Sequence, residues 1–420
     1  MKPFLKLQSV PEVLAALGTF PVPEETDLVP LDESCGRYLA DDLVSDQEVP
    51  GFCRSTVDGF AVRAQDVFGA GESQPALLTL TEPCQMGVDV TRPLQPGEAA
   101  PILTGGMLPD GADAVVMVEY SRPAGGDLVE LTRSVAPWDH VLARDEDVQK
   151  GMLCLKRGQR LRPQDVGLLA ALGHMQVAVA RRPRVALIST GDEVVPADTT
   201  PAAGQIRDVN AHSIAALCRE EGAEVTFAGL LRDDEGTLGD LVNRLCASFD
   251  VVLVSGGSSA GMRDHTLDAF CQGDEKALLC HGVALSPGKP FILARRGSVC
   301  LVGLPGHVAS ALVCARTFVR PLLRHLQGGP VDMLQGHVLA RLSRPIASAQ
   351  GRRDCIRVLL EPLEQPEACC DRVQVAWQAV PITSPSGCIS SLTRATGIVL
   401  CPEQSEGLYE GELVQVELLQ

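Results

Sequence analysis

The chain has 420 residues, 45% of them hydrophobic and 21% charged, and a formal net charge of -17 at pH 7. A single hydrophobic core rarely serves more than about 250 residues, so we expect three or four domains. The negative charge argues against nucleic acid and anionic membranes as partners, and the longest apolar runs, such as residues 251–254, are too short to span a membrane.

The first 47 residues predict a helix at 10–17 followed by a polar extended stretch. Gln8 and Pro11 interrupt the apolar core that a signal peptide would need, so we expect a cytoplasmic protein. The 15 cysteines are scattered, mostly within apolar segments, and form no C-x-x-C pair. This pattern predicts buried, reduced thiols and argues against a disulfide framework, a structural zinc or an iron–sulfur site.

Residues 49–147 predict a β-rich insertion with little apparent core of its own. Gly and Pro turn signals separate short β-branched runs at 77–80, 114–118 and 128–131. A helical pattern returns at 163–173, with Pro163 in the first turn and Gly173 beyond the last. We expect this helix to pack on the helix at 10–17.

Strands and helices alternate from residue 184 to about 326, which predicts a doubly wound α/β domain. The expected strands are at 185–188, 225–230, 251–254, 291–294 and 299–302. The expected helices are at 211–221, 235–247, 264–271 and 308–326. Beyond residue 331, Gly and Pro divide short β-like runs, which predict a small β-barrel or sandwich, at 356–360, 373–377, 398–400 and 413–418.

Polar residues follow the strands of the α/β segment, where open sheets of this class bind their ligands. The residues in question are 189–193, Asp233 with Asp234, and the glycine-rich stretch 255–261 with Asp264. The glycine-rich loop leads into a helix N-terminus, which suits a phosphate or pterin-type polar ligand. The carboxylates suit Mg²⁺, and a negatively charged protein needs such a cation, or local positive charge, to bind an anion.

Each of these features also has an ordinary structural explanation. A Gly-Gly pair before a helix is often only a turn. Asp233, Asp234 and Asp264 could complement helix dipoles, and Glu193 could be a solvated loop residue. The convergence of all of them on one edge of the sheet favours the functional interpretation.

Several whole motifs occur in order along nearly the entire chain. They are residues 50–52, 55–62, 102–106, 109–116, 146–148, 189–193, 204–210, 255–261 with Asp264, 287–290 and 304–306. Together they resemble the motifs of the molybdopterin molybdenumtransferases, the MoeA-type family that includes the E domain of gephyrin. Any one of these motifs is weak, but the ordered set is specific.

The resemblance implies an elongated, four-domain subunit and a homodimer whose cleft combines the α/β domain of one subunit with other domains of its partner. We therefore predict a multidomain α/β plus β protein with a central molybdopterin-binding domain of the doubly wound α/β class. The predicted domains are a split N-terminal helical and linking domain (1–47 with 150–180), a β-rich inserted domain (48–149), the α/β domain (181–328) and a C-terminal β-barrel domain (329–420).

The resemblance also assigns roles to individual residues. Those matching the family's catalytic positions are Asp58, Thr104, Asp147, Glu193, Asp233 and Asp264, of which Glu193, Asp233 and Asp264 would hold Mg²⁺. The expected substrate-binding residues are Ser255, Gly256, Gly257, Ser259, Gly261 and Lys289. The oxyanion site maps onto Pro287, Ser310, Arg357 and Ser386. Arg357 suits this site because a guanidinium offers a fork of donors to a tetrahedral oxyanion, although it could also be an ordinary surface arginine.

The chain departs from the family at several cationic positions. Ser286 stands where lysine is usual before Pro-Gly-Lys, and a second lysine is replaced near His281 or Gly282. His307 and Val308 replace Asn-Pro after Leu-Pro-Gly. Other departures are Pro101 and Leu142 in place of arginines and Thr396 in place of asparagine. Loss of cations should weaken anion binding unless Lys289, His307 or Arg357 compensates.

The function that this resemblance implies is insertion of molybdate into adenylyl-molybdopterin, with Mg²⁺ and release of AMP, in molybdenum cofactor biosynthesis. Insertion of tungstate, an oxyanion of nearly the same size and charge, is one alternative. A noncatalytic molybdopterin-binding carrier or scaffold is another, since family membership does not secure activity. The expected partners are small-molecule substrates and a second copy of the chain, and the resemblance also suggests contact with a molybdopterin adenylyltransferase and apo-molybdoenzymes.

Overall fold

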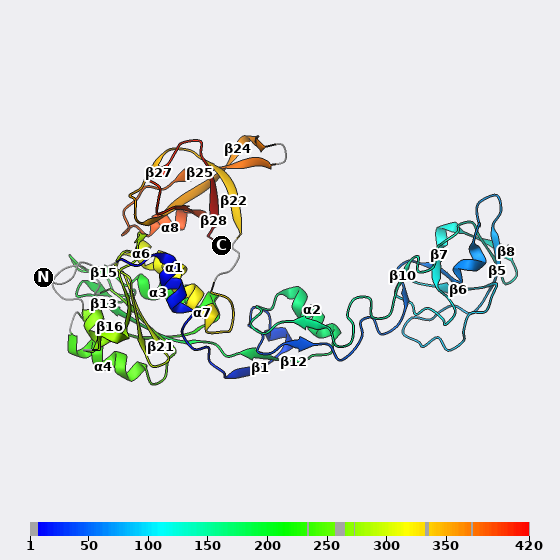
Figure 1. Ribbon diagram of the computed structural model, residues 1–420, viewed down its shortest axis with the longest axis horizontal. Coiled ribbons are helices and arrows are strands. Elements are labelled where there is room, and N and C mark those ends of the chain that lie inside the picture. The colour runs from blue at the N-terminus through cyan, green and yellow to red at the C-terminus, as the bar shows by residue number, and fades with distance from the viewer. Residues whose placement is uncertain are drawn as a thin grey trace.

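The computed structural model describes residues 7–232, 235–256, 265–272, 274–331, 336–370 and 373–419. The molecule is elongated: an α/β body and a barrel lie at one end, a small linking body lies in the middle, and a β-rich insert lies at the far end (Figure 1). The predicted class, multidomain α/β plus β, is confirmed. In the described part of the chain, no helix is long and apolar enough to span a membrane.

The α/β body is built on a six-stranded sheet with the order β16-β13-β17-β21-β20-β18. The first four strands are parallel, and β20 and β18 are antiparallel additions. The bounds of these strands are β13 Arg184–Thr190, β16 Glu224–Leu231, β17 Val251–Ser255, β18 Leu278–His281, β20 Ile292–Arg296 and β21 Val299–Leu304. The predicted strands of this segment are therefore present, and β18 is one that the sequence patterns did not indicate.

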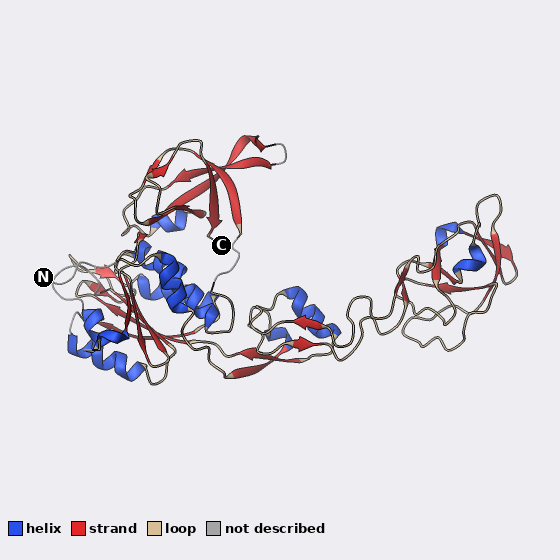
Figure 2. Ribbon diagram, viewed as in Figure 1, coloured by secondary structure: helices blue, strands red, loops and turns tan. Residues whose placement is uncertain are grey.

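Helices cover both faces of this sheet (Figure 2). Consecutive residues of β13 point alternately into two cores: Val185 and Leu187 into one, Ala186 and Ile188 into the other. The first core includes side chains of α1 (Val10–Leu17), α3 (Asn210–Glu220), α6 (Val308–Cys314) and α7 (Arg320–His325), and the second includes those of α4 (Glu235–Leu245) and α5 (His265–Cys271). A π-helical turn, Ala315–Val319, joins α6 to α7, so the long helix predicted over 308–326 is present with one irregular turn.

Helix α1 begins where its capping residues dictate, because Ser9 and Glu12 form a capping box before an apolar face. That face, Val10, Val13 and Leu17, is buried in the α/β core. Helix α2 (Pro163–Ala171) instead buries Leu169 in a separate core within the linking body. The expectation that α2 packs on α1 is therefore wrong, since each helix buries its apolar face in a different body.

The linking body consists of two short antiparallel pairs and α2. Strand β1 (Thr26–Pro30) pairs with β12 (Gln176–Ala180), and β2 (Leu43–Val44) pairs with β11 (Leu153–Leu155). The chain thus leaves toward the insert and returns from it along neighbouring strands. The domain boundaries given above stay a prediction.

The insert has a six-stranded sheet with the order β7-β4-β6-β5-β9-β8. Its strands are β4 Gly59–Val62, β5 Ala76–Leu80, β6 Glu98–Ile102, β7 Ala114–Met117, β8 Ser121–Gly125 and β9 Leu128–Leu131, with a separate pair β3 Arg54–Ser55 and β10 Val141–Leu142. Two apolar clusters fill the insert, one around Val62 and Leu131 and one around Ala61 and Ile102. The expectation of little core in this segment is therefore wrong: its buried apolar residues are spread over many short strands but form two clusters.

The C-terminal region forms a closed barrel, since β26 pairs with both β28 and β24. Its strands are β22 His337–Leu342, β24 Arg353–Cys370, β25 Val373–Pro381, β26 Gly397–Cys401 and β28 Leu413–Leu418, and helix α8 spans Ser390–Arg394. Strand β19 (Leu285–Ser286) of the α/β segment joins β24, so the barrel is tied to the α/β body by a parallel pair.

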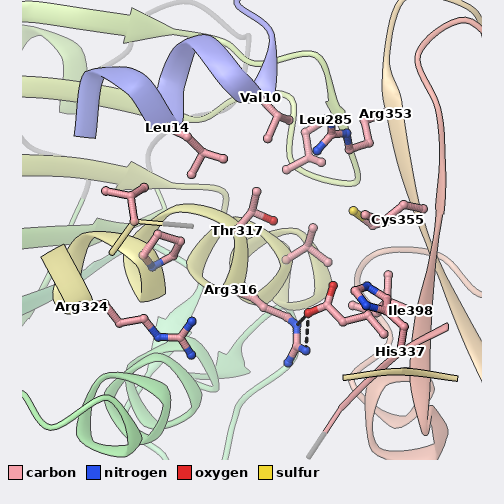
Figure 3. A pocket seen from close by; sticks show the side chains of 15 residues that line it. Val10, Leu14, Leu285, Arg316, Thr317, Arg324, His337, Arg353, Cys355 and Ile398 are labelled. Atoms are coloured by element: carbon pink, nitrogen blue, oxygen red, sulfur yellow. Dashed lines mark hydrogen bonds and ion pairs between the residues drawn. The ribbon is translucent and has the colours of Figure 1, made fainter. Parts of the chain in front are cut away.

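A second tie is an ion pair between Arg316 of the long helix and Glu417 of β28, with the Arg316 Nε 2.9 Å from the Glu417 Oε1 (Figure 3). It crosses a cavity of about 380 Å³ that is lined by α1, the long helix and the barrel. Leu14, Leu285 and Ile398 supply apolar wall. The barrel therefore meets the α/β body across a cavity with both apolar and charged walls, which the ion pair spans.

A buried cluster of charges secures α3 to the long helix. Glu221 is 2% exposed, and its carboxylate accepts hydrogen bonds from Arg324 at 2.8 and 3.0 Å and also from Arg320. Burial alone would raise the pKa of Glu221, but the hydrogen bonds from the two guanidinium groups outweigh it and hold the pKa below its usual value.

We predict that Glu221→Gln destabilises the protein by about 3 kcal/mol, because it leaves the buried Arg324 without a carboxylate partner. A carboxylate with a lowered folded pKa stabilises the fold above its unfolded pKa, and that contribution is lost as the pH falls through the folded value. The acid-induced loss of stability should thus be shallower in the variant. Denaturant unfolding at neutral and acidic pH measures both effects.

The matched control is Glu220→Gln, because Glu220 is exposed and pairs with the same Arg320 at 3.2 Å. An exposed pair contributes about 0 to 1 kcal/mol. Equal losses in the two variants would contradict a special role for the buried carboxylate.

Candidate functional site

The carboxyl ends of β13, β17 and β21 meet at one rim of the α/β sheet, and Asn210 ties this rim together. The Asn210 Nδ2 donates to the Ser255 Oγ at 2.8 Å and to the Gly306 carbonyl at 2.8 Å. Asn210 is the first residue of α3, Ser255 ends β17, and Gly306 follows β21. One side chain therefore fixes a helix and two strand ends to each other.

Gly256 lets the backbone of the rim fold more tightly than any other residue would allow. Its φ is 104°, and a Cβ at this position would lie 2.3 Å from the Thr190 carbonyl oxygen. Its N–H donates to the Leu304 carbonyl at 3.2 Å. The predicted binding residue Gly256 thus brings the ends of three strands into backbone contact.

Several polar atoms at this rim are buried and have no hydrogen-bond partner among the described residues. They are the Ser189 Oγ, Thr190 Oγ1, Asp208 Oδ2 and Asn210 Oδ1. A buried polar group without a partner costs about 1 to 3 kcal/mol, so a group of them at the ligand-binding edge of an α/β sheet is suited to a polar ligand. Asp208 and Asn210 were not predicted as individual site residues, although both lie in the 204–210 motif.

A cavity of about 470 Å³ opens beside two of these residues, Asp208 and Asn210. Its walls come from residues 205–210, from residues 306–308 after β21, and from Gly387 and Ile389 of the barrel. We call it the rim cavity. The barrel therefore contributes one wall of a cavity at the sheet edge.

A second cavity, of about 550 Å³, lies between β19 and the barrel, and we call it the barrel cavity. Pro287, Arg357 and Ser386 line it, as does Ser286. These are three of the four residues predicted for the oxyanion, together with the position where lysine was expected. The fourth, Ser310, is buried in the first turn of α6, and it follows Ala309, whose N–H donates to the Ser386 carbonyl at 3.0 Å.

Arg357 is 8% exposed, and its guanidinium already makes hydrogen bonds within the barrel. Nη1 donates to the Ser391 Oγ at 2.6 Å and Nη2 to the Ser384 carbonyl at 2.7 Å. Burial lowers the pKa of Arg357. A guanidinium has five N–H donors, so these two bonds leave others for an anion in the cavity.

Other predicted residues of the α/β segment are exposed. Glu193 lies in the loop after β13, and its carbonyl accepts from the Ile206 N–H at 2.8 Å. Lys289 follows β19, and its carbonyl accepts from the Val283 N–H at 3.0 Å. Both side chains are therefore open to solvent close to the elements that line the two cavities.

The predicted residues Asp58, Thr104 and Asp147 belong to the segment 48–149, whose sheet lies at the opposite end of the molecule from β13 and β15 (Ile206–Arg207) (Figure 1). The Thr104 N–H and Oγ1 both donate to the Asp58 Oδ1 at 2.7 Å. These bonds, first that from the backbone N–H, lower the pKa of Asp58. Asp147 is exposed, and its N–H donates to the Val49 carbonyl at 3.1 Å. Within one chain these residues do not meet the rim.

The remaining predicted residues, Asp233, Gly257, Ser259, Gly261 and Asp264, lie outside the described residues. Two of the three proposed Mg²⁺ ligands are in this group. Among the side chains that the structure does describe, no cluster of three or more His, Cys, Asp or Glu is arranged to hold a metal ion.

Family models match most of the chain. Residues 8–173 match the MoeA N-terminal region (domain I and II), residues 186–325 match a probable molybdopterin binding domain, and residues 339–419 match the MoeA C-terminal region (domain IV).

Curated relatives and solved structures agree with these matches. Molybdopterin molybdenumtransferase 2 of Mycobacterium tuberculosis is 36% identical over 79% of this chain and 83% of its own length. Molybdopterin molybdenumtransferase of Bacillus subtilis is 30% identical over 98% of this chain and 94% of its own. The crystal structure of a molybdopterin biosynthesis MoeA protein from Pyrococcus horikoshii OT3 is 31% identical, covers 98% of this chain and 100% of its own, and has a TM-score of 0.83.

We predict that Thr104→Val raises the pKa of Asp58 partway toward its usual value. The variant loses the hydroxyl donor but keeps the backbone N–H donor. Of these two hydrogen bonds, the one from the backbone N–H lowers the pKa of Asp58 more. Carboxyl NMR titration of Asp58 measures the shift. An unchanged pKa would show that the hydroxyl does not stabilise this carboxylate.

Proposed function

The chain belongs to the MoeA family of molybdenum cofactor biosynthesis proteins, and from this premise we propose that it is a molybdopterin molybdenumtransferase. The reaction would insert molybdate into adenylyl-molybdopterin and release AMP. The observation that carries the proposal is the pair of adjoining cavities, one beside a rim of unsatisfied polar atoms and one containing a buried arginine.

The rim suits the pterin substrate because its unsatisfied atoms include both donors and acceptors. Ser189 and Thr190 hydroxyls can donate or accept, whereas the Asp208 and Asn210 oxygens accept. A pterin ring presents both kinds of group. Because Gly256 has no side chain, such a ligand could approach the backbone closely at this turn.

The barrel cavity suits molybdate, which enters as a substrate. Arg357, itself mostly buried, supplies positive charge in its wall, and the Ser286 and Ser386 hydroxyls can donate to oxyanion oxygens. Holding the oxyanion next to the pterin would convert a bimolecular encounter into a reaction between positioned groups.

We further propose that the site uses Mg²⁺. Glu193 offers an exposed carboxylate in the loop after β13, and Asp233 and Asp264 are proposed as the other ligands. Carboxylate oxygens together with substrate phosphates form the ligand set that Mg²⁺ prefers, so this donor set fits the ion. When bound, the ion would neutralise charge on the phosphates of the substrate.

A homodimer would explain why Asp58, Thr104 and Asp147 lie so far from the rim of their own chain. In a two-fold dimer, the insert of one subunit can reach the α/β body of the other. Exposed apolar side chains on the linking body, including Leu28 (68% exposed) and Met175 (65% exposed), support self-association there. A cytoplasmic location and contacts with molybdopterin adenylyltransferase and apo-molybdoenzymes belong to the same proposal.

A single-turnover assay tests the proposed function. Purified protein is mixed with adenylyl-molybdopterin, Mg²⁺ and either molybdate or tungstate, and AMP release is followed. AMP release with molybdate supports the transferase. Release only with tungstate would identify the alternative oxyanion, and binding of the pterin without AMP release would identify a noncatalytic carrier.

We predict that Asp58→Asn and Glu193→Ala chains, each inactive alone, recover about a quarter of normal AMP release when equal amounts are unfolded together and refolded. Random pairing makes about half of the dimers mixed, and a mixed dimer has one of its two composite sites intact. Single-turnover rates measure the recovery, with each variant refolded alone as the control. Failure to recover activity while light scattering shows mixed dimers would contradict the composite site.

We predict that Ser286→Lys tightens molybdate binding about tenfold to a hundredfold, because a charge-assisted hydrogen bond contributes about 1.5 to 3 kcal/mol. Ser286 lines the barrel cavity and pairs in register with Asp354, whose carboxylate is already engaged by Arg352 and Ser348. Calorimetric titration of molybdate and tungstate measures the change.

Ser286→Met is the matched control, because it adds similar length without charge. Unchanged or weaker affinity for both anions in folded Ser286→Lys would show that the oxyanion binds elsewhere. Equal tightening in the methionine variant would assign the effect to side-chain bulk.

A further inference from the structure

The barrel loop of residues 382–391, whose last two residues begin α8, separates the two cavities described above. Ser384 and Ser386 line the barrel cavity, and Gly387 and Ile389 line the rim cavity. This short segment therefore lies between the barrel cavity, where we propose that molybdate binds, and the rim cavity, where we propose that the pterin binds. The position of this wall sets the separation between whatever binds on its two sides.

Arg357 holds this loop from the barrel side. Besides the two guanidinium bonds to Ser384 and Ser391, the Arg357 carbonyl accepts from the Ile382 N–H at 2.9 Å. The Ser391 Oγ in turn donates to the Cys388 carbonyl at 2.6 Å. The two ends of the loop are thus fixed to β24.

The middle of the loop is held from the α/β side, and both contacts are made at Ser386. The Ser386 carbonyl accepts from the Ala309 N–H at 3.0 Å. The Ser386 Oγ lies 2.8 Å from the Nδ1 of His307, the residue that precedes α6 and lines the rim cavity. Of these two contacts, only the bond to His307 restrains the Ser386 hydroxyl itself.

We propose that His307 is a positioning residue that orients the Ser386 hydroxyl for the oxyanion and holds the wall between the two substrates. This inference rests on the proposed function, because it assigns the oxyanion to the barrel cavity. His307 contacts the rim cavity on one side and the oxyanion's serine on the other. It acts on the oxyanion through Ser386 and makes no contact with the barrel cavity itself.

The expected effect of removing the imidazole is small and specific. His307 is exposed, so water competes for its hydrogen bond, and a neutral hydrogen bond contributes about 0.5 to 1.5 kcal/mol. We expect His307→Ala to weaken molybdate binding about two- to fivefold. The KM for molybdate should rise while the KM for adenylyl-molybdopterin changes less.

His307→Asn is the matched variant. The δ oxygen and nitrogen of asparagine are attached to Cγ, as Nδ1 is in histidine, so asparagine can keep a hydrogen-bonding atom near the Ser386 hydroxyl. Its affinity for molybdate should stay close to that of the unmodified chain. A purely structural role for the ring would leave alanine and asparagine equally impaired.

Calorimetric titration of molybdate alone against the full chain tests the proposal, using His307→Ala, His307→Asn, Ser386→Ala and a double variant that combines His307→Ala with Ser386→Ala. The expected result is weaker binding in His307→Ala, near-normal binding in His307→Asn, and no additional loss when the His307 change is added to Ser386→Ala. Thermal unfolding confirms that each variant is folded.

Three outcomes overturn the inference while leaving the proposed function intact: unchanged affinity in His307→Ala, equal loss in the alanine and asparagine variants, or a full His307 effect in the absence of the Ser386 hydroxyl. If the unmodified chain binds no molybdate and releases no AMP, the proposed function fails, and the inference fails with it. The two failures are therefore distinguishable from the unmodified chain alone.

Discussion

Burial of strand β13 on both faces is the constraint on which the rest of the molecule depends. Val185 to Ile188 are fully buried and alternate between two apolar cores, so a shift by one residue would exchange side chains of different size between two close-packed cores. Its neighbours β16 and β17 inherit that register. The strand ends therefore meet at a fixed rim. Asn210 joins two of them by hydrogen bonds, and Gly256 allows their backbones to approach closely.

The proposed oxyanion site gives the attachment of the barrel to the α/β body an electrostatic role. A chain of net charge -17 needs a local source of positive charge to hold an oxyanion. Arg357 comes from the barrel, and the parallel pairing of β19 with β24 together with the Arg316–Glu417 ion pair keeps that barrel against the α/β body. Cys355 and Ile398 of the barrel belong to the apolar core of the α/β body, and this contact does not depend on charge.

The sequence predicts those elements whose bounds depend on neighbouring residues alone. The capping box at Ser9 and Glu12 and the spacing of Val10, Val13 and Leu17 predict α1 to the residue. Which body α1 packs against depends on residues far away in the sequence, and the prediction that it packs against α2 was wrong. Strand β24 runs over 18 residues, of which only 356–360 were predicted, because its length is set by pairing with β25 and β26 rather than by its own composition.

In the candidate site, the sequence predicts the charged and polar residues but not the partners that the fold brings to them. Arg357 and Ser386 stand out by chemistry and by resemblance, and both line one cavity. The partners that orient them could not be found from spacing, since Ser384 and Ser391 lie 27 and 34 residues from Arg357, and His307 lies 79 residues from Ser386. Asp208 and Asn210 became visible only when burial showed which of their atoms lack a partner among the described residues.

The location of α1 also governs the order in which the chain can fold during synthesis. The His325 Nε2 lies 2.8 Å from the Phe20 carbonyl oxygen, 305 residues away, and α1 shares its core with Phe318 and Leu322. The linking body and the insert, which close on themselves through β1–β12 and β2–β11, are complete long before that core can form. On the ribosome, the apolar residues of 10–17 therefore stay unburied while two later bodies fold, and the α/β body closes only after its last helix has emerged.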